Sequence, residues 1–473
     1  MLVIGHIARE ELRLRLLMIE AAQATITPDR RRSVSILPHF DCSDKMPTGA
    51  DMVDRITDYA RQLAVFLPDE RLRRVLGRGV AGIVTHRSPI IARMVSLPTA
   101  SSCQPESSAK QLCRFFRNAR VRPRDLWRGL YGRTRTQVEQ QANSLVPVII
   151  DGVNLEKPYA RKLPGLSTIH KQAATNRHSD RALTCGYPAL AVAALVGTCP
   201  ALTFAHLFSY VDAAFLSVKR QMRRAILTTT TVLHGYTVRF IGDREFDDDQ
   251  VLPWMAQGGH QFLVRAFRRR TIEVWDGATQ TWRRSSTQEC AETLPLPAVF
   301  HATFTHARKQ RDATIRLGYC RIRLLTTTKL ECWLIVGHAS IFRKPLWLLT
   351  NAPIVNLAAA VALWWQFRTR PHIEHLFRLL QERGMDIEDV RLRTKERIEK
   401  LVAVVWAAAQ FLWHLSLTLP HAVQQWLRRL GGKPDDKRGS NGLYLLLYGL
   451  SALLVAYFVS LLTRNPQVDR GTP

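Results

Sequence analysis

Two aspartates of this 473-residue chain stand where the sequence could support metal-dependent chemistry. Asp151 directly follows the apolar run VPVII at residues 146–150, and Asp243 follows YTVRFIG at residues 236–242. Both runs have the composition of β-strands, and open α/β sheets collect ligands at the carboxyl ends of their strands. Carboxylate oxygens are the ligands that hard cations such as Mg²⁺ prefer, whereas His and Cys select zinc. The placement therefore indicates a candidate site for a hard divalent cation.

A third acid, Glu374, lies in the helical stretch RPHIEHLFRLL at residues 370–380. Each of the three acids alone also has an ordinary structural interpretation. An Asp after a strand commonly forms a turn or caps a helix, and a Glu beside an apolar helix face commonly pairs with a neighbouring arginine. The residue types alone leave both interpretations open.

Three blocks of sequence together point to a known family. They are VPVIIDGVNLEK at 146–157, YTVRFIGDREFD at 236–247 and FRTRPHIEHLFRLLQ at 367–381. In order and spacing they resemble the catalytic blocks of bacterial insertion-sequence DDE transposases. The closest branch, which also contains the transposon Tn-five enzyme, has a β-rich insertion in its ribonuclease-H-like domain. Asp243 lies 92 residues after Asp151 and Glu374 lies 131 residues after Asp243, so the longer gap would house that insertion.

The third block follows the signature Y-x2-R-x3-E-x6-K of this branch only in part. Arg370 and Glu374 match it, whereas Phe367 replaces the tyrosine and Gln381 replaces the lysine. Phe367 lacks the hydroxyl donor and Gln381 lacks the cation that lies near the DNA backbone in the family. Contact with phosphate at these two positions is therefore in question.

The resemblance implies a catalytic, metal-binding triad of Asp151, Asp243 and Glu374 that holds Mg²⁺, with Mn²⁺ as the alternative. Two such ions about 4 Å apart activate a water or a 3′-hydroxyl and stabilise the leaving oxygen of a phosphodiester. In this hypothesis Asp151 bridges the ions and the other two acids each complete one side. The residues that we expect to contact DNA are Arg370, Gln381, Phe367, Arg244, Arg268, Arg269 and Arg270.

The composition independently favours a polyanionic partner. Lys and Arg total 67 against 39 Asp and Glu, a formal net charge of +28. An excess of this size fits nucleic acid or an anionic membrane and is not needed for a neutral small substrate. The 46% hydrophobic content excludes a purely disordered basic chain. Eight cysteines without a C-x-x-C pair argue against a zinc ribbon and fit a reducing cytoplasm.

The succession of strands, a helix and a further strand predicts an α/β protein with a mixed sheet, and the resemblance implies that this sheet is ribonuclease-H-like. A helical DNA-binding domain precedes the sheet, a β-rich insertion interrupts it, and helices follow it. A helix is expected over residues 211–230. The expected divisions are a basic, weakly structured leader at 1–48, the helical domain at 49–143, the catalytic core at 144–258 and 345–400, the insertion at 259–344 and a carboxy-terminal helical region at 401–473.

Residues 443–462 form an uncharged run of 20 residues, long enough to cross a bilayer. We expect a buried helix or a subunit contact there, because no second run is as apolar; a membrane anchor is the competing interpretation. The sequence thus predicts a cytoplasmic, nucleoid-associated bacterial transposase that cuts and joins double-stranded DNA at inverted repeats. The resemblance further implies a homodimer in the DNA complex. The alternative is a catalytically impaired, DNA-binding relative of a transposase.

Overall fold

The structure is a computed structural model that describes residues 46–96, 105–141, 143–158, 160, 162–171, 183–306, 309–326, 329–381, 384–432 and 442–464. The chain divides into two compact units, Met1–Met46 and Pro47–Pro473, and the account below concerns the second. The predicted leader at 1–48 therefore lies almost wholly outside the described residues.

The second unit begins with helices whose starts are set by capping side chains. The Thr48 hydroxyl accepts a hydrogen bond from the backbone N–H of Asp51, and the Asp51 carboxylate accepts one from the backbone N–H of Thr48. Asp69 caps the next long helix in the same way through the N–H of Leu72. These contacts satisfy amide groups that lack a partner within the helix. The helices are α2 (Gly49–Leu63), η1 (Ala64–Phe66), α3 (Glu70–His86), α4 (Ile91–Met94), α5 (Pro105–Arg117) and α6 (Pro123–Glu139).

The chain then enters a sheet in which twelve described strands are joined by hydrogen bonds. The first half comprises β1 (Leu145–Glu156), β2 (Ser167–His170), β3 (Leu183–Val196), β4 (Cys199–Leu207), β5 (Thr237–Gly242) and β6 (Gln261–Arg265). Strand β3 pairs antiparallel with both β1 and β4, whereas β5 pairs parallel with β1 and β6 pairs parallel with β5. The spatial order of this part is therefore β4, β3, β1, β5, β6, and the protein has the predicted mixed α/β architecture.

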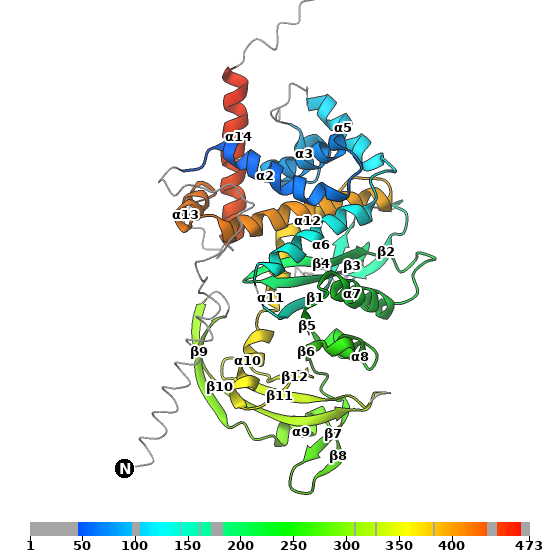
Figure 1. Cartoon of the computed structure of the whole chain (residues 1–473), viewed down its shortest axis with the longest axis vertical. Coiled ribbons are helices and arrows are strands. Elements are labelled where there is room, and N and C mark those ends of the chain that lie inside the picture. Colours follow the sequence, from blue (N-terminus) through cyan, green and yellow to red (C-terminus); the bar gives the residue numbers. More distant parts are fainter. Residues whose placement is uncertain are drawn as a thin grey trace, which may run out of the picture. The chain divides into compact units, whose positions relative to one another are not determined.

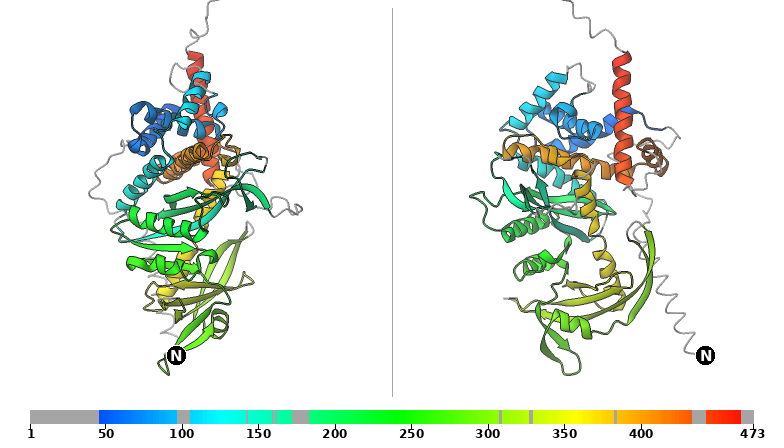
Figure 2. Two further views of the ribbon diagram at one scale, coloured as in Figure 1. Left: turned by 90° about the vertical axis from the view of Figure 1, so that its right-hand side faces the viewer. Right: turned by 180° about the vertical axis from the view of Figure 1, so that it is seen from behind.

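Helices cover both faces of this part of the sheet (Figure 1). Side chains alternate between the faces along each strand, so Ile149 and Ala191 pack toward α6 and the carboxy-terminal helices. Ile150 and Val192 point to the other face, which is covered by α7 (Val218–Val232) and α8 (Val251–Ala256). These two helices lie side by side in both further views (Figure 2). The sheet is thus buried between two helical layers.

Helix α7 begins later than the apolar pattern predicted. We expected a helix over 211–230, but it starts at Val218, where the Ser217 hydroxyl accepts a hydrogen bond from the N–H of Arg220. Residues 211–216 instead form turns, in which Phe215 stacks on Phe208 at 5.7 Å between ring centroids. The cap, rather than hydrophobic spacing, decides this helix start.

The second half of the sheet is antiparallel and extends the first half. It comprises β7 (Thr271–Asp276), β8 (Thr281–Ser286), β9 (Ala298–His306), β10 (Lys309–Leu324), β11 (Glu331–Ala339) and β12 (Leu346–Thr350), with α9 (Thr287–Thr293) between β8 and β9. Strand β12 joins the halves, because it pairs with β6 on one side and β11 on the other. The expected insertion began at residue 259, but β6 belongs to the parallel part, so the antiparallel extension starts at β7.

The carboxy-terminal part is helical, as predicted. It comprises α10 (Leu357–Phe367), α11 (Pro371–Gln381), η4 (Ile387–Asp389), α12 (Lys395–Thr418), α13 (His421–Leu430) and α14 (Gly442–Arg464). Among the described residues, α12 and α14 are long and apolar enough to cross a membrane by length and composition alone. Helix α12 is mostly buried in the core, and α14 places Leu446, Leu450 and Leu454 in the same core.

Candidate active site

The two aspartates leave the sheet at the same level of adjacent parallel strands. The parallel pairing of β1 with β5 ends at the pair Ile150 and Gly242, and Asp151 and Asp243 are the next residues of the two strands. Each aspartate is two residues beyond an isoleucine, Ile149 or Ile241, that packs into the core on the α11 side. The alternation along a strand therefore directs both carboxylates to that same side.

Gly242 has no side chain, and this allows the tight turn that holds Asp243 at the edge of the sheet. A Cβ atom at this position would lie 2.8 Å from the Phe246 ring, which is fully buried beneath the turn. The chain can therefore fold into the short 3-10 turn η2 (Arg244–Phe246) immediately after the strand. This turn fixes both Asp243 and Glu245 at the edge of the sheet.

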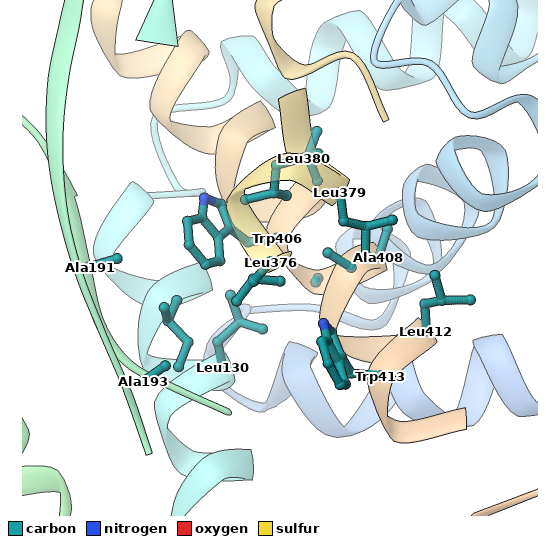
Figure 3. Close-up of a cluster of buried hydrophobic side chains, with 14 of the residues drawn as sticks. Leu130, Ala191, Ala193, Leu376, Leu379, Leu380, Trp406, Ala408, Leu412 and Trp413 are labelled. Carbon is teal, nitrogen blue, oxygen red and sulfur yellow. The ribbon is translucent and has the colours of Figure 1, made fainter. Parts of the chain in front are cut away.

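Helix α11 brings the third acid to the same edge. Its buried residues include Leu376, Leu379 and Leu380, which lie in one cluster with Leu130 of α6, Ala191 of β3 and Trp406 of α12 (Figure 3). Glu374 is only partly buried and lies outside this apolar face. Packing of the helix therefore determines where its carboxylate is held.

One guanidinium group contacts all three acids. Arg370 Nη2 lies 3.0 Å from Asp151 Oδ2 and 3.7 Å from Asp243 Oδ2, while its Nη1 forms an ion pair with Glu374 Oε1. The two aspartate oxygens can thus be no more than 6.7 Å apart, the sum of their distances to Nη2. The structure brings the three predicted acids together although they are far apart in sequence.

A fourth carboxylate, Glu245, belongs to the same cluster. It lines the cavity described below, and its Oε1 lies 3.6 Å from the point where a Cβ of Gly152 would stand. Glu245 belongs to the second sequence block, Asp243-Arg244-Glu245-Phe246, but it was not among the predicted site residues. The signal that could have found it is the turn itself, because an acid two residues after Asp243 returns to the sheet edge.

The cluster carries more negative charge than Arg370 balances. Burial raises the pKa of Asp151 to about 7, with further increases from Glu245 and Glu374, although Arg370 and the Gly152 N–H oppose them. Desolvation within the cavity and the Asp243 charge also raise the pKa of Glu245. Burial would lower the pKa of Arg370, but the surrounding carboxylates raise it. Arg265, 3.7 Å from Asp243, and Arg378, 3.9 Å from Glu374, add positive charge, but four acids still outnumber the three arginines, so the site favours an additional cation.

Asp151, Asp243, Glu245 and Arg370, but not Glu374, line a cavity of about 380 Å³. Its polar lining includes Asp151, Asn154, Asp243, Glu245 and Arg370, and Tyr210 lies at its wall. The Tyr210 side chain is exposed, so solvent and a ligand can reach the carboxylates from this side. The cavity combines acids, one arginine and an accessible opening in one place.

The carboxylate oxygens of the site suit a hard cation, but in this structure the Arg370 guanidinium lies among them. All four acids offer carboxylate oxygens, the ligands that Mg²⁺ prefers. Within the described residues, however, no three His, Cys, Asp or Glu side chains form a group with metal-binding geometry. Because Arg370 occupies the space among the carboxylates, cation binding requires its guanidinium to move.

Two residues that we expected to contact DNA are used inside the protein. Phe367 is only 8% exposed and belongs to the hydrophobic core. Gln381 Nε2 donates a hydrogen bond to the backbone oxygen of Asn154 at 2.6 Å, which joins α11 to β1. Both side chains therefore have partners within the protein, and their contact with DNA stays a prediction.

The basic run at residues 268–270 divides into two kinds of arginine. Arg270 is a structural residue, because its guanidinium forms ion pairs with the buried Asp247 and with Asp249. Arg268 and Arg269 are exposed and remain available for phosphate contact. Arg244 is also exposed and lies beside Phe267, 6.0 Å from the ring centroid. Arg270 therefore has a structural role, and DNA contact by Arg244, Arg268, Arg269 and Arg270 stays a prediction.

Comparisons with known proteins give little further information. No protein-family model matches the chain, and no curated protein matches its sequence. The chain is similar to a solved structure of the piggyBac transposase synaptic complex with hairpin DNA, with a TM-score of 0.40 and 9% identity. That match covers 89% of this chain and 84% of the other. A likeness of this degree carries no conclusion about fold or activity.

Proposed function

We propose that this protein is a DNA transposase that cuts and joins strands by metal-dependent phosphoryl transfer. The observation that carries the proposal is the convergence of Asp151, Asp243 and Glu374 on one guanidinium at the edge of the sheet. Residues of different strands and a helix have no structural need to place three acids together, since like charges repel. Such clusters are characteristic of sites that bind divalent cations.

The topology supports a ribonuclease-H-like assignment for the core. Three antiparallel strands, β1, β3 and β4, are followed by α7, then β5 parallel to β1, α8 and β6 parallel to β5. The acids come from the first strand, the end of the fourth core strand (β5) and a later helix. This is the arrangement that the sequence resemblance implies, although the sheet continues beyond β6 through β12.

In the proposed site, Asp151 and Asp243 would bind Mg²⁺ together with Glu374. When bound, the ions would activate a water or a 3′-hydroxyl and stabilise the leaving oxygen. Glu245 would contribute negative charge from the cavity wall. A DNA phosphate offers the Arg370 guanidinium a bidentate partner, and moving to it would release the three carboxylates. Arg370 would then hold the strand that is to be cut.

The proposed partner is double-stranded DNA, in agreement with the formal charge of +28. We also propose that the protein acts as a homodimer and works in the cytoplasm at the nucleoid. These assignments follow from the resemblance in the third block and from the charge of the chain.

A cleavage assay tests the proposal. The substrate is plasmid DNA that carries the sequences flanking the coding region, and the variants are Asp151→Asn, Asp243→Asn and Glu374→Gln. Each should lose at least 100-fold in Mg²⁺-dependent strand cutting while DNA affinity changes by less than about threefold. The matched control is Asp54→Asn, since Asp54 is an exposed acid on α2. Undiminished cutting by Asp151→Asn would exclude this site.

A DNA-binding protein without catalytic activity is the second candidate, and Arg370 is the observation that favours it. A guanidinium that contacts all three acids can serve as a permanent structural counter-ion. In that case the wild-type chain would bind DNA but would not cut it at any Mg²⁺ or Mn²⁺ concentration.

A further inference from the structure

A second cavity, of about 400 Å³, lies where α4 and α5 face the start of α12. Helix α5 lies beside the start of α12 in this part of the molecule (Figure 1). The cavity shares no lining residue with the candidate active site. Its polar lining is dominated by four arginines, Arg117, Arg391, Arg393 and Arg397.

Among the described residues, no acidic side chain pairs with any of the four arginines. No acidic side chain among the described residues lines this cavity, and none of the four forms an ion pair with another described residue. Neighbouring lysines differ in this respect. Lys395 pairs with Asp212 at 2.9 Å, and the buried Lys400 pairs with Glu396 at 2.7 Å. Unlike these two lysines, the four arginines of the cavity have no acidic ion-pair partner among the described residues.

The position of these arginines is unfavourable for the helix beside them. Thr394 caps α12, so Arg391 and Arg393 lie just before its amino terminus and Arg397 lies in its first turn. The amino end of a helix carries partial positive charge and is stabilised by acids, whereas cations there are destabilising. Folding alone would thus favour other residues at these positions, and a bound anion would offset the repulsion.

The walls of the cavity limit the kind of anion. Ile90, Ile91 and Leu392 provide a partly exposed apolar surface between the arginines, while Phe116 is buried and cannot stack on a base. Guanidinium groups bind phosphate oxygens in a bidentate manner, and an apolar surface suits a deoxyribose. Phosphates separated by sugars match this alternation of charge and apolar surface.

We infer that this arginine cavity, formed by Arg117, Arg391, Arg393 and Arg397, binds the phosphodiester backbone of DNA apart from the active site. The choice of DNA as the source of the phosphates rests on the proposed function. The cavity would hold a strand between the amino-terminal helices and α12 while another part of the DNA lies at the carboxylates.

The test uses the full chain carrying Arg391→Gln, Arg393→Gln and Arg397→Gln together. Affinity for a 30-base-pair duplex is measured by fluorescence anisotropy over a range of salt concentrations. Each lost phosphate contact lowers the slope of log affinity against log salt by about 0.9, so the slope should fall by roughly 2 to 3. Arg429→Gln is the control, because Arg429 is exposed on α13 away from the cavity, and its slope should equal that of the wild type.

Thermal unfolding of the same variant separates binding from folding. Because three cations leave the positive end of α12, the midpoint should stay the same or rise while DNA affinity falls. An unchanged salt slope would overturn the inference. Loss of binding to inorganic phosphate or a mononucleotide with undiminished DNA affinity would also overturn it, because the cavity would then take a free anion.

The outcome is distinguishable from that of the proposed function. If the triple variant binds DNA like the wild type while Asp151→Asn loses cutting, the cavity inference fails and the transposase proposal stands. If the salt dependence of DNA affinity falls as expected in the triple variant but the wild type never cuts DNA, the cavity inference stands and the catalytic proposal fails.

Discussion

At the scale of single residues, Arg370 is the centre of the candidate site. It is 17% exposed, and it is the ion-pair partner shared by Asp151, Asp243 and Glu374. The same arginine keeps the carboxylates together and keeps a cation out. Its removal therefore tests how much of the stability of the site depends on a positive charge.

We expect Arg370→Gln to lower the free energy of unfolding by about 3 kcal/mol in the presence of a chelator, because the carboxylates lose their buried counter-ion. Adding Mg²⁺ should restore much of the loss. Arg378→Gln is the control, since Arg378 is more exposed and lies 3.9 Å from Glu374, and it should change stability by less than about 0.5 kcal/mol. Urea unfolding with and without Mg²⁺ measures both. Equal stability of Arg370→Gln and wild type in chelator would contradict this role.

His414 gives the protein a predictable response to acid. Its Nε2 lies 3.1 Å from Arg133 Nη2 and accepts a hydrogen bond as the neutral ring. Burial, together with Arg133 and Arg55, lowers the pKa of His414 to about 4. The unfolded chain therefore binds a proton between pH 6.5 and 4 that the folded chain does not, and stability falls as the pH falls through this range.

The expected contribution of His414 is about 1.4 kcal/mol for each pH unit between 6.5 and 4. A His414→Gln variant should retain an acceptor for Arg133 and should lose this part of the acid sensitivity. Urea unfolding at pH 7, 6 and 5 measures the difference between the two proteins. Parallel pH profiles for variant and wild type would show that His414 does not titrate in this way.

At the scale of elements, the register of β1 with β5 and the turn after β5 determine where the acids stand. Gly242→Ala should destabilise the protein by about 1 to 3 kcal/mol, because the added methyl group meets the buried Phe246 ring. It should also displace Asp243 and Glu245 and reduce cleavage. Gly132 on α6 is the matched control, since a Cβ there meets nothing within 4 Å.

Gly132→Ala should raise stability by about 0.5 to 1 kcal/mol, because alanine favours the helix more than glycine does. Thermal unfolding of both variants measures the contrast. Unchanged stability of Gly242→Ala would contradict this role, because it would show that a methyl group fits beside the Phe246 ring.

Elements were easier to predict than the destinations of side chains. The apolar runs that end in Asp151 and Asp243 predict the ends of two strands, because a strand is recognised from residues that are neighbours in the sequence. Phe367, Gln381 and Arg270 were predicted only as DNA contacts. The sequence does not show that the packing of α10 and α11 and the turn after β6 bring them to the core, a strand carbonyl and Asp247. Likewise, the sequence of β6 resembles that of the strands predicted for the insertion. Only its parallel pairing with β5 assigns it to the central part of the sheet.

At the scale of the whole molecule, the described core runs without interruption from the first helices to the last. One cluster contains Met52 of α2, Leu130 of α6, Leu376 of α11 and Phe458 of α14. Helix α11, which carries Glu374, packs on α12, β1 and β4, and α12 in turn packs on α2, α3 and α14, so the site depends on packing throughout the unit. Single-sequence patterns cannot show this, because the contacts join residues hundreds of positions apart.

The central claim is that the acids of this molecule bind divalent cations when DNA is present. The most direct measurement is an electron paramagnetic resonance titration of Mn²⁺ with the full chain bound to duplex DNA. The wild type and Asp54→Asn should each bind two Mn²⁺ ions per chain, and Asp151→Asn should bind neither. Equal Mn²⁺ stoichiometry in Asp151→Asn and wild type would contradict it.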